Sequence, residues 1–303
     1  MKILDKILQM KKINLIYWSG QNFGDALSPR LIEELTGLPT QYKSWQPSYA
    51  GRLKNLIGKI VRLRFAEVGT ILWPQEKSII AVGSVIRWGN SRSQVWGSGF
   101  MNSDEPFGGG KIYAVRGKLT SQKLLRMGYP KCEIFGDPAL LLPLWIPARK
   151  VKKHKLGIIP HWKEVEAFQD KLGENFNIID LRTHDVERIV RAICDCEYIL
   201  STSLHGLIVA HAYGIPALWI KEGYIDTDGF KFRDYFSSVD IPFYEGFENL
   251  EEIFATENAW MSLFEANPDK ASSRVDLRKV QRRLLKAFPF SLRPKYHNLI
   301  TYE

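Results

Sequence analysis

The stretch EYILSTSLHGLIVAHAYGIPALWI (residues 197–220) decides the fold of this 303-residue chain. The runs EYILS and PALWI are typical of buried β-strands, and the apolar segment between them has the length and composition of a helix. A strand, a helix and a second strand in this order predict one unit of a parallel sheet. His205 lies where the first strand ends and the helix begins, so three roles are open to it: packing, anion binding or proton transfer.

The same alternation extends outward from this unit. INLIYWS (residues 13–19) reads as a strand, and Leu27, Leu31 and Leu35 are spaced as on one face of a helix that ends before Gly37. The runs SIIAVGS, SQVWGSG, KIYAVRG and CEIFGDPALLL indicate further strands with glycine-containing turns, and LGIIPH and NIIDLR begin a second series. We therefore predict an α/β protein with two parallel-sheet domains.

A proline-punctuated, basic stretch separates the two series. Pro138 and Pro147 lead into ARKVKKHK, which reads as a linker. After the second series the chain reads as a helical tail, whose last segment opens with a predicted capping box of Ser273 and Asp276. The predicted parts are an N-terminal α/β domain (1–148), a C-terminal α/β domain (149–245) and a tail that packs back on them (246–303).

The charge of the chain predicts an anionic partner. Its formal net charge is +9 and its pI is near 9.3, and basic residues gather in segments 52–64 and 270–295. Segment 52–64 also places its apolar residues on one helical face. It is either a helix packed on the domain with a solvated basic face, or a helix that docks on anionic lipid. No recognised nucleic-acid-binding module is present.

The sequence predicts a cytoplasmic location, with contact at the inner face of the cell membrane. No apolar run is long enough to span a bilayer, and the N-terminus is a poor secretory signal. Three cysteines without a CxxC pattern favour buried thiols in a reducing compartment. The short Asp226-Thr-Asp228 pattern is too common to predict a metal site, and no metal or cofactor is expected.

Chemistry-bearing residues gather at the predicted carboxyl ends of strands, where open parallel sheets bind ligands. Several of these residues are also explained by an ordinary structural role. Asp25 could be a helix N-cap, Asp137 a turn former and Arg116 half of a surface salt bridge, while His211 on an apolar helix reads as core. The strand-end candidates are Asn22, Asp25, Ser84, Arg116, Asp137, His161, Ser203 and His205.

Five segments in order, NFGD, VWGSGF, AVRGKLT, GDPALLL and STSLHGLIVAHAYGIP, resemble the polysaccharide pyruvyl transferases. The resemblance covers roughly residues 15–240. It implies a fold like the two-domain GT-B glycosyltransferases, with two Rossmann-like domains facing a cleft. It also implies transfer of a pyruvyl group from phosphoenolpyruvate to a sugar or lipid-linked oligosaccharide, which forms a cyclic ketal on bacterial surface polysaccharides or their precursors.

The resemblance assigns roles to single residues. It places Asp25 at the cleft, Arg116 on the anionic donor and His205 at the centre of the chemistry. Because of their positions at strand ends, Asp137 is a further catalytic candidate, and Asn22 and His161 are candidates for the acceptor side. Where some members have arginine, this chain has Ser203, so other groups must meet the donor's charge. The candidates for this are Arg116, Ser84, Lys118, Ser203, Lys221 and Lys231.

Ketal formation from an enol phosphate needs an acid, a base and a cradle for the anion. His205 is expected to act as the acid: its helix N-terminus lowers the imidazole pKa, and a bound phosphate raises it. Two other functions stay open. A nucleotide-sugar glycosyltransferase would need an acid for the ribose, for which only Glu222 is available, and a non-catalytic relative would explain Ser203. A dehydrogenase is disfavoured because no GxGxxG follows the first strand.

Overall fold

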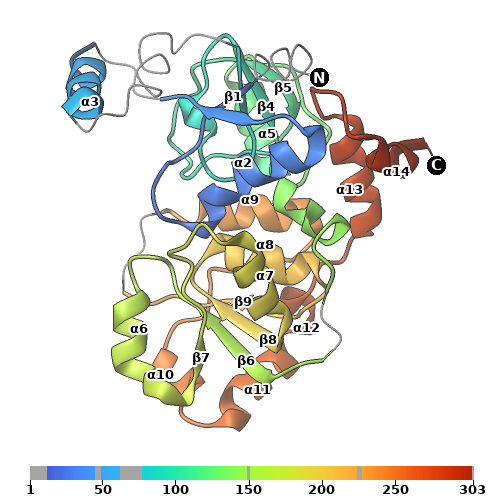
Figure 1. Ribbon diagram of the computed structural model, residues 1–303. Coiled ribbons are helices and arrows are strands. Elements are labelled where there is room, and N and C mark those ends of the chain that lie inside the picture. The colour runs from blue at the N-terminus through green and yellow to red at the C-terminus, as the bar shows by residue number, and fades with distance from the viewer. Residues whose placement is uncertain (1–11, 45–48, 62–76, 149–150, 224–226, 302–303) are drawn as a thin grey trace, which may run out of the picture.

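The computed structural model describes residues 12–44, 49–61, 77–148, 151–223 and 227–301. Within these residues the chain forms two parallel β-sheets, one above the other in Figure 1, with helices between and around them. The prediction of an α/β protein with two parallel sheets is confirmed.

The first sheet has the strand order β2-β1-β3-β4-β5, and every neighbouring pair is parallel. Its central strands are buried on both faces, as expected for a parallel sheet that helices cover on each side. The strands are β1 (Ile13–Leu15), β2 (Thr40–Tyr42), β3 (Ser78–Ile80), β4 (Ser93–Trp96) and β5 (Lys111–Ala114).

The second sheet has the order β7-β6-β8-β9 and is also parallel throughout. Residues 197–220 fold as the sequence predicts, into a strand, the helix α8 (Leu204–Ala212) and a second strand. Leu200 is paired with Ile158 on one side and with Leu218 on the other. The strands are β6 (His154–Ile159), β7 (Asn177–Ile178), β8 (Cys196–Ser201) and β9 (Ala217–Trp219).

The helix after β1 begins earlier than the sequence predicts. α2 (Phe23–Thr36) has Asn22 as its N-cap, because the Asn22 side chain accepts a hydrogen bond from the Gly24 N–H. Asp25 therefore lies in the first helical turn, and its interpretation as the cap is wrong. The helix ends as predicted at Gly37, whose φ of 72° is left-handed and suits glycine.

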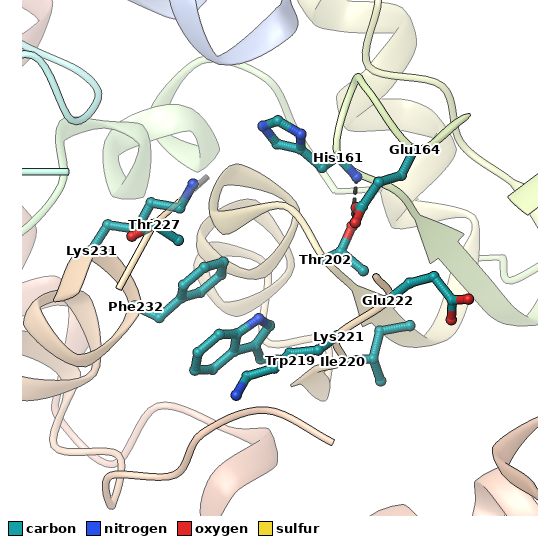
Figure 2. A pocket seen from close by; sticks show the side chains of 10 residues that line it. All are labelled: His161, Glu164, Thr202, Trp219, Ile220, Lys221, Glu222, Thr227, Lys231 and Phe232. Carbon is teal, nitrogen blue, oxygen red and sulfur yellow. Dashed lines mark hydrogen bonds between the residues drawn. The ribbon is translucent and has the colours of Figure 1, made fainter. Parts of the chain in front are cut away.

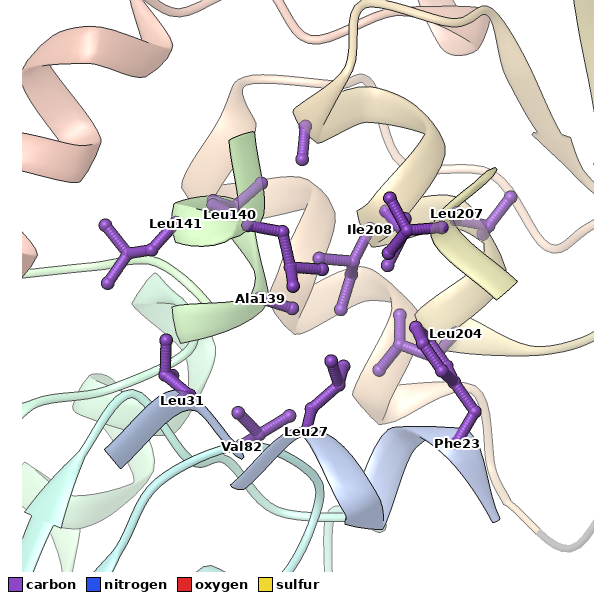
Figure 3. Close-up of a cluster of buried hydrophobic side chains, with 14 of the residues drawn as sticks. Phe23, Leu27, Leu31, Val82, Ala139, Leu140, Leu141, Leu204, Leu207 and Ile208 are labelled. Carbon is purple, nitrogen blue, oxygen red and sulfur yellow. The ribbon is translucent and has the colours of Figure 1, made fainter. Parts of the chain in front are cut away.

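The two sheets share one hydrophobic core (Figure 3). Phe23, Leu27 and Leu31 of α2 point toward the second half of the molecule, and Leu204 and other apolar residues of α8 belong to the same cluster. Since α8 carries apolar residues around almost its whole circumference, it is buried between elements of both halves. The shared core holds the strand ends of the two sheets close to one another.

The apolar stretch that leads into the predicted linker ARKVKKHK is part of this core. Residues Pro138–Leu144 form the 3₁₀ helix η3, whose Leu140, Leu141 and Leu142 are fully buried and which packs against α8. The strand predicted just before it is reduced to a single parallel bridge between Phe135 and Val115. The residues of η3 are apolar because this 3₁₀ helix fills the space between the two sheets.

The C-terminal helices contact both halves. In α13 (Leu277–Lys286) the carbonyl of Leu284 accepts a hydrogen bond from the indole of Trp96, at 2.9 Å. The predicted capping box is wrong: Asp276 is itself the N-cap, and its Oδ1 accepts from the Arg278 N–H at 3.0 Å. On the second half, Phe264 of α11 (Glu257–Ala266) packs on Tyr198.

The remaining helices cover the sheets or connect these elements. They are α3 (Tyr49–Val61), α5 (Lys118–Arg126), α6 (Val165–Leu172), α7 (Val186–Cys194), α9 (Phe230–Val239), α10 (Leu250–Ile253), α12 (Pro268–Ala271) and α14 (His297–Thr301), with the 3₁₀ turns η2 (Ile86–Trp88), η4 (Gly173–Asn175) and η5 (Pro294–Tyr296). Cys132, Cys194 and Cys196 are buried free thiols.

One helix stands apart from the rest. Figure 1 shows α3 at the edge of the molecule, away from both sheets. It exposes Leu53, Ile57, Ile60 and Val61, which recur at helical spacing. Among the described residues no helix is both long and apolar enough to cross a bilayer.

Candidate functional site

The carboxyl ends of strands from both sheets surround a cavity of about 330 Å³. The first sheet contributes the loop between β1 and α2 and the turn after β3, and the second contributes the residues after β6 and the start of α8. This is where open parallel sheets bind ligands. The lining residues are Trp18, Asn22, Asp25, Gly83, Ser84, Val85, Arg87, Trp88, Met101, Asn102, Glu105, His161, Trp162, Ser203, Leu204, His205 and Lys231.

The structure brings most of the predicted site residues together here. Those that line the cavity are Asn22, Asp25, Ser84, His161, Ser203, His205 and Lys231. They come from five separate segments of the chain, which only the packing of the two sheets brings to one place. The cavity therefore joins the predicted donor-binding, acceptor-binding and catalytic residues in one site.

Asp25 holds a carboxyl group whose pKa is shifted toward neutrality. Burial raises the pKa of Asp25 to about 7, and a hydrogen bond from the backbone of Trp18 opposes the shift only in part. A carboxyl group with a pKa near 7 is protonated in a large fraction of molecules at neutral pH. It can therefore donate a proton there, which an ordinary aspartate cannot.

His205 carries the opposite shift. Burial, followed by the positive charges of Arg116 and Lys231, lowers its pKa to about 3. Its Nε2 has no hydrogen-bond partner within the described part of the chain. The ring packs on Gly24, where a Cβ atom would lie 2.1 Å from Nδ1. His205 is thus a neutral imidazole at the cavity with one nitrogen unengaged.

Arg116 lies behind the cavity wall and is fully buried. Its Nε donates to Asp234 of α9 at 3.0 Å, its Nη1 donates to the Ser84 hydroxyl at 2.5 Å, and its Nη2 donates to the Phe100 carbonyl. Asp234 also accepts hydrogen bonds from Thr120. Because Ser84 lines the cavity and Arg116 does not, the guanidinium reaches this space through Ser84 and through its charge.

Three further predicted residues lie outside the lining of the cavity. Asp137 is buried as the N-cap of η3, where its Oδ1 accepts from the Ala139 N–H at 2.9 Å and burial raises its pKa to about 6. Lys118 is half exposed and lies 3.9 Å from Asp240. Lys221 lies beside the carboxylates of Glu245 and Glu248, at 3.9 and 3.5 Å.

His211 is a core residue, as the sequence predicts. It is buried on α8, with Nδ1 3.0 Å from the Tyr235 hydroxyl and Nε2 3.3 Å from the Ala217 carbonyl. Both ring nitrogens therefore have partners inside the protein. His205 lies about one and two-thirds turns earlier on the same helix. It lines the cavity, whereas His211 packs inside the protein.

A smaller pocket of about 20 Å³ adjoins the cavity and shares His161 and Lys231 with it (Figure 2). Here the Thr202 hydroxyl accepts from the His161 N–H at 2.6 Å and donates to Glu164. Glu222, the residue considered for a ribose, is among the residues that line this pocket, and its carboxylate is paired with Lys171 at 3.2 Å. The pocket has room for about one water molecule and none for a nucleotide.

Sequence reasoning missed the aromatic part of the site. Trp18, Trp88 and Trp162 all line the cavity, beside the Arg87–Glu105 ion pair at 3.3 Å. Trp18 and Trp162 follow β1 and β6, so their position after strands was a usable signal. Nothing in the sequence indicated that they meet, since they are contributed by different sheets.

A family model described as "Polysaccharide pyruvyl transferase" matches residues 108–224. The uncharacterized protein L143 of Acanthamoeba polyphaga mimivirus is 31% identical over 170 residues, which are 53% of this chain and 59% of that protein. The succinoglycan biosynthesis protein ExoV of Rhizobium meliloti (strain 1021) is 29% identical over 140 residues, or 44% of this chain and 42% of ExoV. Both alignments span less than two thirds of the relative's length.

One solved structure is similar to this chain over most of its length. It belongs to an uncharacterized protein from Klebsiella pneumoniae subsp. pneumoniae NTUH-K2044, and the match covers 90% of this chain and 96% of that one. The TM-score is 0.42 and the identity is 13%. A likeness at this level carries no argument about function.

Proposed function

We propose that the chain transfers a pyruvyl group from phosphoenolpyruvate to a sugar, forming a cyclic ketal, because a family model described as polysaccharide pyruvyl transferase matches residues 108–224. The cavity carries this proposal: Asp25 and His205 line it together, with pKa values shifted in opposite directions. The name of ExoV, a succinoglycan biosynthesis protein, supports a polysaccharide or its precursor as the acceptor.

The donor anion is held at the α8 side of the cavity. Lys231 lines this part, and Arg116 adds its charge from behind Ser84. The first N–H groups of α8 supply further donors for a phosphate or carboxylate. Ser203, at the N-cap position of α8, offers its hydroxyl where some family members have arginine. Lys231 and Arg116 together replace the charge of that arginine.

The pKa shifts divide the proton-transfer roles between the two residues. In the free protein at neutral pH, His205 is unprotonated, so it is ready to act as a base, whereas Asp25 retains a proton to give. We therefore assign proton donation to Asp25 and proton abstraction to His205, which revises the expectation that His205 is the acid. A bound trianion raises the pKa of His205 and strengthens it as the proton acceptor.

The proposed reaction balances without a metal or redox partner. Asp25 protonates the methylene carbon, which leaves an oxocarbenium-like centre at the adjacent carbon. One sugar hydroxyl attacks this carbon and gives its proton to His205. A second hydroxyl then attacks as the C–O bond to phosphate breaks, and its proton leaves with the phosphate. The proton on His205 returns to Asp25 through solvent, which restores both groups.

A donor-binding measurement tests the proposal. Phosphoenolpyruvate at about 100 times its dissociation constant would stabilise the protein by about 2.7 kcal/mol, which raises the melting temperature by several degrees. A panel of nucleotide sugars should produce no such shift. Lys231→Ala should reduce the shift, whereas Lys118→Ala should not, because Lys118 lies outside the cavity. Stabilisation by a nucleotide sugar and not by phosphoenolpyruvate would contradict the proposal.

Contact with an anionic membrane is a further part of the proposed function. α3 exposes four apolar side chains and overlaps segment 52–64, whose sequence carries basic residues and no acid. An exposed apolar face with flanking positive charge is suited to the surface of an anionic bilayer. This would place the enzyme at the inner face of the membrane beside a lipid-linked acceptor. Absence of co-sedimentation with phosphatidylserine vesicles at low salt would contradict the proposed membrane contact. It would not affect the proposed transferase activity.

A further inference from the structure

We propose that Trp18, Trp88 and Trp162 form the subsite that holds the acceptor sugar ring. This inference rests on the proposed function and specifies the acceptor side of the same cavity. The three indoles come from separate segments: Trp18 after β1, Trp88 in η2 and Trp162 after β6. We call these three residues the tryptophan wall.

The exposure of the tryptophan wall distinguishes it from core tryptophans. Trp96 and Trp219 are 0% and 2% exposed, as expected for side chains in the interior of the protein. The three wall residues are only partly buried, and all of them line the cavity. Their apolar surface is therefore available to a ligand.

Trp18 and Trp162 meet across the two halves of the molecule. Their ring centroids are 5.4 Å apart and the planes are inclined by 37°. Each half thus contributes one indole to a common surface. An indole face carries negative charge in its π-system and attracts the weakly positive C–H groups on one face of a pyranose ring.

The tryptophan wall lies beside both proton-transfer groups, Asp25 and His205. The backbone of Trp18 makes a hydrogen bond to Asp25. Trp162 follows His161, whose N–H donates to Thr202, just before the turn that carries His205. A sugar stacked on these indoles would therefore have its hydroxyls near the groups that exchange protons with it and with the donor.

The size of the cavity favours a sugar ring over a nucleotide. Its volume of about 330 Å³ is at the lower end of small-molecule sites, which span roughly 300–1,000 Å³. A three-carbon acid and one pyranose fit this space together. The polar groups beside the wall, among them Asn102 and the Arg87–Glu105 pair, are suited to sugar hydroxyls.

Direct binding of methyl hexopyranosides tests this subsite without relying on turnover. We expect the methyl glycosides of galactose, glucose and mannose, added singly in the presence and absence of phosphoenolpyruvate, to identify at least one sugar that changes the tryptophan fluorescence. For that sugar, Trp18→Ala and Trp162→Ala should weaken binding and raise the acceptor KM by about three- to tenfold, and Trp162→Phe should restore part of the loss. The thermal shift caused by phosphoenolpyruvate should stay as in the wild type.

Trp145→Phe is the matched control, because Trp145 is partly buried at the C-cap of η3 and lies outside the cavity. It should leave sugar binding unchanged. The inference is overturned if no sugar binds, if the alanine variants bind it normally, or if uridine binds the wall and the sugars do not. A wild type that binds a sugar but shows no phosphoenolpyruvate shift contradicts the proposed function instead, and the sugar-binding result still decides the subsite.

Discussion

Two strand-to-helix turns face the cavity with similar architecture and opposite chemistry. One leads from β1 into α2 and carries Asp25 in the first helical turn. The other leads from β8 into α8 and carries His205 at the second helical position. Burial is the largest influence at both, yet it raises the pKa of Asp25 to about 7 and lowers that of His205 to about 3.

The difference follows from which form of each group is charged. Burial disfavours the charged form, so it keeps a proton on a carboxyl group and removes one from an imidazole. One physical effect applied to two residue types therefore produces a proton donor and a proton acceptor at neutral pH. The positive charges of Arg116 and Lys231 push His205 further in the same direction. The two turns touch at Gly24, which packs against the His205 ring.

The strongest test of the comparison removes the base. His205→Ala should reduce transfer by about two to four orders of magnitude, the usual contribution of general acid–base catalysis. Folding should be unaffected, because the Nε2 of His205 has no partner to lose. His211→Ala is the control on the same helix: it should lower the melting temperature, since Tyr235 and Ala217 lose a buried partner. Near-normal turnover of His205→Ala would show that His205 is a packing residue and not the base.

Removing the acid should have a smaller but more diagnostic effect. Asp25→Asn should reduce transfer by about two orders of magnitude. In the wild type, kcat/KM should fall as pH rises through about 7, where Asp25 loses its proton, and the variant should lack this limb. The ionisation of phosphoenolpyruvate affects both proteins equally, so comparing them in the same buffers isolates the contribution of Asp25. An unchanged alkaline limb in the variant would assign the acid to another group.

The same variant also tests the pKa shift through stability. Below about pH 4, Asp25 is protonated in the folded and unfolded states, so Asp25→Asn should change the melting temperature little. Between about pH 4 and 7 the Asp25 carboxyl ionises in the unfolded state but keeps its proton in the folded state. The folded wild type therefore loses stability as the pH rises through this range, and the variant does not. The advantage of the variant should level off above pH 7. A constant difference across this range would contradict the shift.

The contact between the turns gives the smallest expected effect. In Gly24→Ala, the new methyl group would lie 2.1 Å from Nδ1 of His205, so the imidazole must move. We expect transfer to fall by about one order of magnitude, since small displacements of a catalytic group are costly. Gly58→Ala is the matched control, because a Cβ atom at Gly58 of α3 meets nothing within 4 Å. Equal activity of the two variants would show that the position of His205 is not set by Gly24.

Much of the fold was predictable from local patterns. Apolar runs that alternate with helical periodicity predicted the two series of strands, and the predicted end of the first helix before Gly37 is confirmed. The failures concern segments whose role depends on distant partners. CEIFGDPALLL reads as a strand and turn, but its residues from Pro138 onward belong to a buried 3₁₀ helix that packs against α8 and fills the space between the two sheets.

The candidate site divides in the same way. Residues at strand ends could be identified from the sequence, because the carboxyl ends of parallel strands meet at one edge, and this is how Asp25, Ser84 and His205 were found. The location of Arg116 behind the wall could not be predicted, since its partner Asp234 is 118 residues away in the chain. The tryptophan wall was missed for the same reason.

The sequence by itself determined the chemical groups at the strand ends and the order of strands and helices, because both depend on residues near one another in the chain. Tertiary structure alone decided which of those groups share a cavity and which protonation state each prefers. Those properties depend on burial and on charges contributed by distant segments. His205 and His211 show the distinction most directly: both lie on one apolar helix, and only the surrounding elements make one a packing residue and the other a base at the cavity.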